Sequence, residues 1–405
     1  MKIFLSILLS FFIYTTNIVA QYCTEDNRFT EKEYFSIAQI DSTFDLTYGS
    51  ALNWQNSNED LKLDIYYPSI NQDNLSERPF VLIIHGGSFL IGDKADWRFV
   101  CREFAKRGFV VATINYRLGY DDNESNGLKK AIYRAHQDAN ASIRFIIQNH
   151  DLYKIDTSAL FIGGGSAGAY TSLNVIYTSQ QEWEYTYLGI SNLLGDLDNS
   201  GNLFNHSYKF KGVFNNWGST VGAFIEHENM LPMISFHGEL DDIVDVDTTL
   251  NGVYGSRKIH EVLLKKNICS DLTIKTDGGH VIYSDKEGSI FRVGRASCFF
   301  KSIFCDNCTD FYSTNYIPAN CSETNSLLEK NETKHYSIYP NPFNANLNIN
   351  NLVGNESIIL SNYLGQQLYV GQNISEVNTK ELNKGIYFLT ISSQNSKETF
   401  KLIKE

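Results

Sequence analysis

Residues suited to chemistry gather in the glycine-rich segment Gly164–Gly168, whose sequence is Gly-Gly-Ser-Ala-Gly. An apolar run ending at Ile162 precedes it and a segment with helical periodicity follows, so Ser166 is expected on a tight turn between a strand and a helix. Its small neighbours allow a crowded backbone, and the helix dipole favours negative charge there. The pattern predicts a nucleophilic serine. The alternative is a glycine-rich turn whose serine only caps the helix.

A serine hydroxyl becomes a good nucleophile when a histidine takes its proton, and that histidine needs a carboxylate to orient it. His280 is the expected base, because it follows a predicted strand and the pair Gly278-Gly279, beyond the acid in chain order. Asp241 is the expected acid, in the loop 237–245 that follows a buried apolar run. Three other carboxylates of this loop are competitors, most of them explained by a solvated acidic loop: Glu239, Asp242 and Asp245.

A second glycine pair is suited to stabilise the negative charge that acyl transfer develops. The segment 85–89, His-Gly-Gly-Ser-Phe, follows the apolar run 80–84, at the sheet edge where the ligand-binding loops of a parallel sheet gather. The N–H groups of Gly86 or Gly87, together with that of Ala167, are predicted to form an oxyanion hole. An ordinary glycine turn is the alternative.

Other residues bear on the substrate. Ser88 and Trp217 are candidates for substrate contact, although core packing explains Trp217 nearly as well. The segment 182–205 is rich in Trp, Tyr and Leu and is a candidate cap over the acyl site. Within it, Asp196–Asn202 has the pattern of the start of a calcium loop but lacks the closing glutamate, so a simple turn is expected. No metal ion is expected.

The elements that must position these residues alternate between strands and helices, which predicts an α/β fold with a mostly parallel central sheet flanked by helices. The segment 61–67 alternates polar and apolar residues and predicts an early antiparallel strand. Apolar runs predict strands at 80–84, 109–114, 159–162, 210–214 and 232–236, and a last strand is predicted at 271–276. Helices are predicted at 97–107, 128–150, 167–177, 256–266 and 287–304.

Composition and charge limit the classes of function. The 405 residues have 42% apolar content and a formal net charge of -12, with no clustered Lys/Arg face, which argues against a nucleic-acid partner. Residues 1–20 combine Lys2, an apolar run and Ala20 at the break, and predict a secretory signal peptide. That run is too short to span a bilayer, and no later run is long enough, so no transmembrane segment is expected.

The cysteines suit an oxidising compartment, where they pair, and their odd number leaves one unpaired. The seven are Cys23, Cys101, Cys269, Cys298, Cys305, Cys308 and Cys321. The sequence does not give their connectivity. No second pair of Cys or His lies at zinc-finger spacing from the last three, so disulfides or idle thiols are favoured over zinc.

Composition changes after the last predicted helix. Residues 305–335 are rich in Asn, Thr, Ser, Glu and Cys and lose apolar periodicity. We therefore expect a linker there, between a catalytic domain at 21–304 and a second module at 336–405. Short apolar runs separated by Asn and Gly predict a small β-sandwich in this module, at 347–349, 357–360, 385–391 and 400–403.

Together, residues from about 44 to 304 resemble the α/β-hydrolase superfamily, in particular its carboxylesterase and lipase branch. The motifs are His85-Gly86-Gly87, Asn115–Leu118, Gly164-x-Ser166-Ala167-Gly168, His237-Gly238-x-x-Asp241-x-x-Val244 and Gly279-His280. The resemblance implies ester hydrolysis without a metal or organic cofactor, and it assigns the triad roles to Ser166, Asp241 and His280. Asp245 departs from the family, which often has proline at that position.

The C-terminal module resembles the sorting domain of type IX secretion. The likeness rests on Tyr339–Asn344, Leu364–Leu368, Lys384–Leu389 and the basic tail Lys401–Lys404. It implies recognition by the secretion machinery and export across the outer membrane, followed by release or attachment at the cell surface. A small substrate-binding β-domain is the alternative.

These observations predict a secreted serine carboxylic-ester hydrolase that forms an acyl-enzyme, with short acyl esters or acetyl and feruloyl esters of polysaccharides as candidate substrates. One alternative is a serine peptidase of related fold, which normally carries a large N-terminal domain. The other is an idle binding protein, which should have lost a triad residue. The sequence does not distinguish a small ester from a glycan, a lipid or a polyester.

Overall fold

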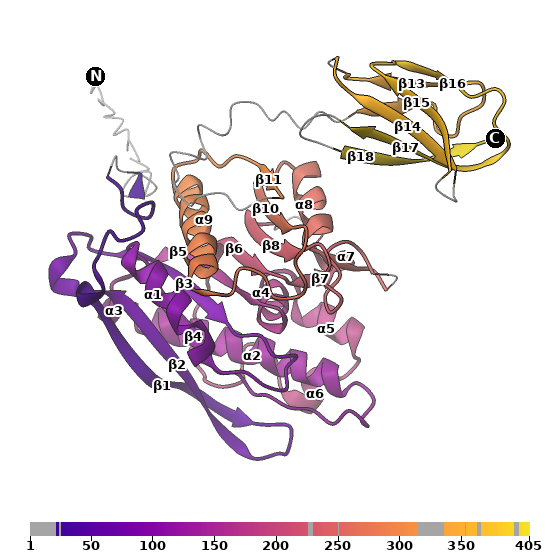
Figure 1. Ribbon diagram of the computed structural model, residues 1–405. Helices are drawn as coiled ribbons and strands as arrows, with labels where there is room; N and C mark the ends of the chain where they lie inside the picture. Colours follow the sequence, from indigo (N-terminus) through magenta and orange to yellow (C-terminus); the bar gives the residue numbers. More distant parts are fainter. Residues whose placement is uncertain are drawn as a thin grey trace, which may run out of the picture. The chain divides into compact units, whose positions relative to one another are not determined.

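The computed structural model describes residues 22–23, 26–225, 230–249, 251–314, 336–352, 354–362, 366–392 and 397–405. The chain forms two compact units, which divide between residues 324 and 325 (Figure 1). The signal peptide predicted at 1–20 lies outside the described residues. Among the residues described, no helix combines the length and apolarity that crossing a membrane requires.

The first unit is built on a nine-stranded sheet with the order β1-β2-β4-β3-β5-β6-β8-β10-β11. Strand β2 (Asn58–Pro68) pairs antiparallel with β1 (Ile40–Leu52) and with β4 (Val110–Ile114). The remaining neighbours pair in parallel. They are β3 (Arg78–Ile84), β5 (Ile155–Gly165), β6 (Phe210–Asn216), β8 (Met233–Gly238), β10 (Ser270–Lys275) and β11 (Phe311–Ser313). The predicted α/β fold with an early antiparallel strand and a parallel centre is confirmed.

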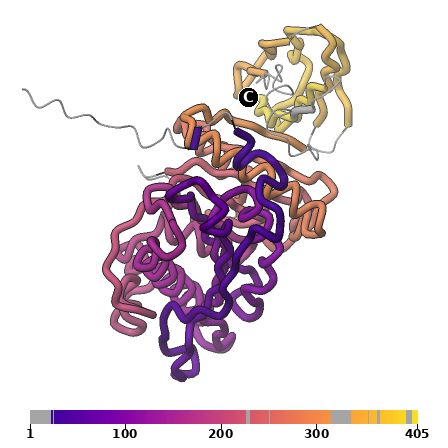
Figure 2. Tube along the Cα trace, turned by 90° about the vertical axis from the view of Figure 1, so that its left-hand side faces the viewer, coloured from indigo at the N-terminus to yellow at the C-terminus, as the bar shows by residue number. Residues whose placement is uncertain are grey.

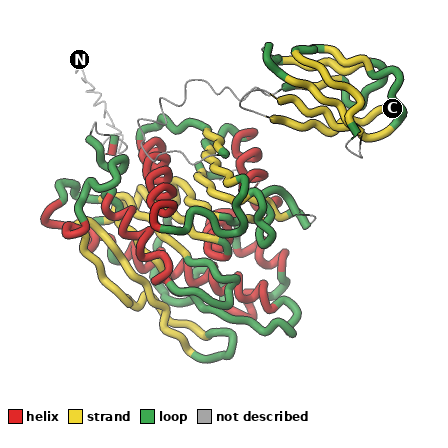
Figure 3. The backbone as a smooth tube through the Cα atoms, in the orientation of Figure 1, coloured by secondary structure: helices red, strands yellow, loops and turns green. Residues whose placement is uncertain are grey.

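Side chains of the central strands alternate between two core layers, one on each face of the sheet. On one face, Val81 and Phe161 pack with α1 and α9. On the other, Leu82 and Ile162 pack with α2 and α4, and Val213 packs with α8. Figure 3 shows helices covering both faces. The long helices are α1 (Arg98–Lys106), α2 (Gly127–Gln148), α4 (Ala167–Tyr177), α8 (Ser256–Lys265) and α9 (Lys286–Phe304), each within two residues of its prediction.

Short elements complete the first unit. The helical turns are η2 (Ile37–Gln39), η3 (Ile70–Gln72), η4 (Lys94–Trp97), α3 (His150–Tyr153), α5 (Gln180–Thr186), α6 (Ile190–Leu194) and α7 (Gly222–Ile225). A two-stranded antiparallel ribbon joins β7 (Ser219–Val221) to β9 (Val253–Gly255).

The segment 182–205, expected as a cap over the acyl site, packs on α2 instead. Trp183 and Leu197 join a small apolar cluster with Tyr133 of α2. Trp183 Nε1 donates to His136 Nδ1 at 3.0 Å, and Gln137 Nε2 donates to the carbonyl oxygens of residues 194–196 at 2.9–3.2 Å. Trp183, the tryptophan that suggested a cap, is therefore used in packing against a helix.

Residues 305–314 belong to the first unit, so the prediction that a linker begins at residue 305 was wrong. They form β11, which pairs in parallel with β10, and they carry two disulfide-bonded cysteines. Cys305 bonds Cys23, and Figure 2 shows the indigo N-terminal segment beside the orange end of α9. Because backbone pairing and disulfides hold this segment, it needs little of the apolar periodicity by which strands are predicted.

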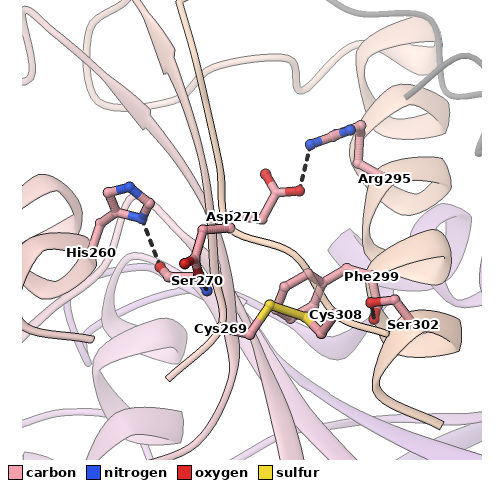
Figure 4. Close-up of a disulfide and its surroundings, with 9 residues drawn as sticks. His260, Cys269, Ser270, Asp271, Arg295, Phe299, Ser302 and Cys308 are labelled. Atoms are coloured by element: carbon pink, nitrogen blue, oxygen red, sulfur yellow. Dashed lines mark hydrogen bonds and ion pairs between the residues drawn. A yellow bond between two sulfur atoms is a disulfide. The ribbon is translucent and has the colours of Figure 1, made fainter. Parts of the chain in front are cut away.

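The second disulfide, Cys269–Cys308, lies where β10 is held from several sides (Figure 4). Asp271 of β10 forms an ion pair with Arg295 of α9, and Ser270 Oγ lies 2.8 Å from His260 Nδ1 of α8. These contacts fix the strand that leads into the loop bearing His280. Elsewhere in the described residues, Cys298 is disulfide-bonded and Cys101 is buried and unpaired.

The second unit is a separate β domain made of two antiparallel sheets, as predicted. One has the order β12-β13-β16 and the other β15-β14-β17-β18. Side chains from both sheets form its core, among them Leu347, Ile358, Leu389 and Leu402. The strands are β12 (Ser337–Tyr339), β13 (Asn346–Asn350), β14 (Ser357–Asn362), β15 (Gln367–Gln372), β16 (Glu376–Asn378), β17 (Gly385–Ser392) and β18 (Lys397–Lys404).

Replacing both cysteines of the second disulfide, Cys269→Ser with Cys308→Ser, should lower the free energy of unfolding of the first unit by about 2–4 kcal/mol. The reason is that the chain loses a cross-link closing a loop of 39 residues. Urea unfolding followed by circular dichroism measures the change. A reductant should lower the urea midpoint of the unmodified chain by at least as much as the double substitution does. An unchanged midpoint in the double variant would show that the cross-link does not stabilise the unit.

Candidate active site

Ser166 lies on a sharp turn in which β5 ends directly before it and α4 begins directly after it. Its backbone has φ 54° and ψ −122°, a strained conformation for a residue with a side chain. Its N–H donates to the carbonyl oxygen of Asn216 at 3.0 Å. A Cβ on Gly164 would lie 2.3 Å from the Ile84 carbonyl oxygen, and one on Gly168 would lie 2.0 Å from it. Glycine at both positions therefore allows β3 to approach the turn.

The structure brings Ser166, His280 and Asp241 into one hydrogen-bonded line. Ser166 Oγ lies 2.8 Å from His280 Nε2, and His280 Nδ1 lies 2.8 Å and 3.0 Å from the two oxygens of Asp241. Because an ionised carboxylate only accepts, Nδ1 carries the imidazole hydrogen and Nε2 is left to accept from the serine. The Asp241 side chain is fully buried, whereas His280 is 18% exposed.

Asp241 is ionised despite its burial. Burial by itself raises the pKa of this carboxyl group, but hydrogen bonds from His237, His280 and the N–H groups of Val244 and Ile243 lower the pKa below its usual range. The two N–H donors lie 2.8 and 2.9 Å from Oδ1, and His237 Nε2 lies 3.0 Å from Oδ2. A fixed negative charge therefore faces His280 at neutral pH.

The three competing carboxylates of this loop point elsewhere. Glu239 forms an ion pair with Arg257, and Asp245 accepts a hydrogen bond from the Asp247 N–H at 2.8 Å. Asp242 is exposed.

A chain of polar contacts behind Asp241 fixes the tautomer of the buried His237. Asn215 Nδ2 donates to Ser256 Oγ at 3.0 Å, and Ser256 Oγ lies 2.7 Å from His237 Nδ1. Since the amide NH₂ donates to the serine oxygen, the hydroxyl hydrogen is available for His237 Nδ1. His237 then carries its own hydrogen on Nε2, facing Asp241 and the Val244 carbonyl oxygen.

The predicted oxyanion loop lies against the nucleophile. A Cβ on Gly86 would lie 3.2 Å from Ser166 Cβ and 2.7 Å from the Gly165 carbonyl oxygen. Gly87 has φ 112°, which favours glycine, and the loop turns back from it toward α1. Ala167 is the first residue of α4, where an N–H group has no partner within the helix. Gly86 and Ala167 therefore lie beside Ser166, and Gly87 lines the same cavity.

His85 holds this loop in place through a hydrogen bond and a ring contact. Its Nδ1 donates to the Gly86 carbonyl oxygen at 2.7 Å, and its ring stacks on Tyr116 with centroids 4.4 Å apart. Burial lowers the pKa of His85, so the ring stays neutral at physiological pH.

A cavity of about 780 Å³ opens at Ser166 and His280. Ser88 and Trp217, both predicted to contact substrate, lie in its lining. The other lining residues come mainly from the segments 86–100 and 280–292, and none comes from the segment 182–205. Across the part of the chain that is described, no group of three or more His, Cys, Asp or Glu is arranged to hold a metal ion.

Sequence reasoning missed Arg292, a buried cation of α9 that supports the turn. Its Nη1 donates to Asn216 Oδ1 at 2.6 Å, and Asn216 Nδ2 donates to the Gly164 carbonyl oxygen at 2.8 Å. The guanidinium lies 5.5 Å and 5.1 Å from the ring centroids of Trp97 and Trp217. Burial lowers the pKa of Arg292 to about 9, so it remains charged. No sequence signal marked it, because a single arginine in a helix is ordinary.

Comparisons with known proteins agree with this division of the chain. Residues 63–229 match the family model described as BD-FAE, and residues 337–405 match the one described as secretion system C-terminal sorting domain. A neuroligin-like protein of Caenorhabditis elegans is 32% identical over 109 residues, which are 27% of this chain and 15% of that protein. A probable isoprenylcysteine alpha-carbonyl methylesterase of Oryza sativa subsp. japonica is 32% identical over 109 residues, 27% of this chain and 23% of the relative. The chain thus spans less than a quarter of the length of these relatives.

Similar solved structures include esterases. Esterase B from Lactobacillus rhamnosis is 18% identical, with 66% of this chain and 87% of that chain covered and a TM-score of 0.46. An esterase from Thermogutta terrifontis with propionate bound is 18% identical, with 68% and 97% covered and a TM-score of 0.48.

The two family matches fall on different compact units. The BD-FAE match lies within the first unit, and the sorting-domain match lies within the second. The sorting domain indicates a protein that type IX secretion releases or attaches at the cell surface. Within the first unit, residues 63–229 thus resemble the BD-FAE family, and within the second, residues 337–405 resemble a secretion system C-terminal sorting domain.

Proposed function

We propose that the chain is a secreted serine carboxylic-ester hydrolase in which Ser166 is the nucleophile, His280 the general base and Asp241 the orienting carboxylate. The observation that carries the proposal is the line of hydrogen bonds from Asp241 through His280 to Ser166 Oγ, beside a cavity. The match to the BD-FAE family model and the relative named as a methylesterase also support ester hydrolysis.

In the first half of the reaction, His280 Nε2 takes the Ser166 proton as Oγ bonds to the ester carbonyl carbon. The carbonyl electron pair moves onto oxygen, and the N–H groups of Ala167 and of Gly86 or Gly87 donate to that oxyanion. The bond to the alcohol oxygen then breaks, and the leaving alcohol takes the proton from His280. The product of this half is an acyl group on Ser166.

In the second half, water replaces the alcohol. His280 takes a proton from water as the water oxygen attacks the acyl carbon, and the same N–H groups stabilise the second oxyanion. The bond to Oγ breaks, Ser166 regains its proton from His280, and the acid leaves. Asp241 stabilises the imidazolium in both halves because its charge is fixed by donors other than His280.

The first unit carries the chemistry in this proposal, and the second serves recognition by the secretion machinery. Ester substrates are expected to enter the cavity bounded by Ser88 and Trp217. Its volume of about 780 Å³ lies within the range of small-molecule sites, so it accommodates acyl groups larger than acetyl, feruloyl included.

Hydrolysis of p-nitrophenyl acetate, butyrate and octanoate tests the proposal. We expect turnover by the full chain, and a loss of kcat by at least about 10⁴-fold in Ser166→Ala, because this change removes the hydroxyl that is bonded to His280 Nε2. Circular dichroism should show an unchanged fold in the variant. If no ester is hydrolysed at any acyl length, cleavage of peptide substrates would assign the chain as a peptidase instead. Binding of peptides without cleavage would assign it as a binding protein.

Ser256→Ala tests the contacts behind the triad carboxylate. We expect kcat to fall about tenfold with little change in KM, because His237 loses the partner that keeps its Nε2 hydrogen on Asp241. Ser142→Ala is a matched control, since it removes a buried serine that bonds only a backbone carbonyl of α2. Equal kcat values in the two variants, or a change confined to KM, would indicate that Ser256 is only a packing residue.

A further inference from the structure

Three exposed aliphatic side chains surround the opening of the catalytic cavity. Ile91, Ile243 and Val281 are 71%, 67% and 55% exposed, and all three line the cavity that contains Ser166 and His280. They come from three separate loops, which follow β3, β8 and β10. Isolated exposed aliphatic residues are common on proteins, but convergence of three on one opening is a feature that folding alone does not explain.

More than half of the surface of each of these side chains is exposed to solvent. None of them packs against the apolar clusters formed by the described residues of the first unit, in contrast to Trp97 and Trp217 deeper in the same cavity. Their backbones are fixed where they stand. The N–H of Ile243 donates to Asp241 Oδ1 at 2.9 Å, and Val281 directly follows His280. Ile243 and Val281 are therefore held at fixed positions relative to Asp241 and His280.

Three of the charged residues in the lining bond within the protein, whereas a fourth, Lys286, is exposed. Asp285 accepts from the Gly288 N–H at the start of α9, and Asp96 accepts from the Asp93 N–H. Arg292 lies between two indole rings and bonds Asn216. An apolar group that leaves the cavity therefore meets three aliphatic side chains at its opening, together with the exposed Lys286.

We propose that Ile91, Ile243 and Val281 form an apolar rim that binds the part of the substrate extending beyond the cavity, and that the substrates are esters with a long apolar chain. This inference rests on the proposed ester hydrolysis. Contact with the rim removes apolar surface of both partners from water, which favours longer chains over shorter ones. The chain can belong to the acyl or to the alcohol side of the ester, because both sides leave the same carbonyl carbon at Ser166.

The test compares long and short esters in the full chain. The rim variant is Ile91→Ser, Ile243→Ser and Val281→Ser together. The matched control is Leu152→Ser, Leu188→Ser and Leu203→Ser, which changes residues that are 62%, 88% and 86% exposed and outside the cavity lining. One pair of substrates, p-nitrophenyl decanoate and butyrate, reports on the acyl side. The other, decyl acetate and ethyl acetate, reports on the alcohol side.

We expect the ratio of kcat/KM for the long ester to that for the short ester to fall about tenfold in the rim variant, for the pair whose chain meets the rim. The control variant should keep the ratio of the unmodified chain. Unchanged ratios for both pairs, or an equal fall in the control, would overturn the proposal.

A binding measurement separates this inference from the assignment of the reaction. Quenching of tryptophan fluorescence by p-nitrophenyl decanoate in the Ser166→Ala chain follows binding without turnover, since Trp97 and Trp217 line the cavity. We expect binding to weaken about tenfold when the rim substitutions are added. If the unmodified chain hydrolyses no ester, the proposed function fails, and this measurement alone decides whether the rim binds an apolar chain. Equal affinity with and without the rim substitutions would show that it does not.

Discussion

Ser166 is held at φ 54°, a conformation that costs a residue with a side chain about 1–3 kcal/mol, and its neighbours supply the contacts that hold it there. Its N–H is bound by the Asn216 carbonyl, and the Asn216 side chain is bound in turn by Arg292 and by the Gly164 carbonyl. Two core layers meet at this point, because α9 supplies Arg292 from one face of the sheet and α4 begins on the other. The strain at one residue is therefore balanced by contacts from both faces of the sheet.

A second constraint is the buried negative charge of Asp241. An ionised carboxylate without donors is costly to bury, and here two backbone N–H groups and two imidazoles share the task. Because His237 and the backbone already satisfy the carboxylate, the contact with His280 serves orientation more than burial. The polar contacts of Ser256 and Asn215 behind His237 extend this arrangement into α8 and β6, so Asp241 is held by elements that do not line the cavity.

The features that could be predicted from the sequence are those that have a local sequence pattern. Continuous apolar runs located the central strands, and the spacing of Gly and Ser at 164–168 located the turn that the structure shows. Local patterns fail where a contact joins distant segments. Arg292 has no motif, and its role depends on α9 crossing the sheet to reach Asn216. Strand β11 lies in a polar, cysteine-bearing stretch because pairing with β10 and the Cys269–Cys308 bond hold it. The segment 182–205 was predicted to be a cap because the sequence does not show that Trp183 and Leu197 pack against α2.

The position of the cavity follows from the way in which the loops leave the strands of the sheet. Strand ends position the three residues of the proposed triad, since β5 leads to Ser166, β8 to Asp241 and β10 to His280. Two of these loops also carry Ile243 and Val281, which lie two residues beyond Asp241 and one beyond His280, and the loop after β3 carries Ile91, four residues beyond Gly87. An exposed side chain beside a fixed backbone contributes little to folding, so it can change with the substrate while the chemistry stays in place. In this fold, selectivity for the outer part of a substrate is therefore expected at the opening, and the reaction itself at the strand ends.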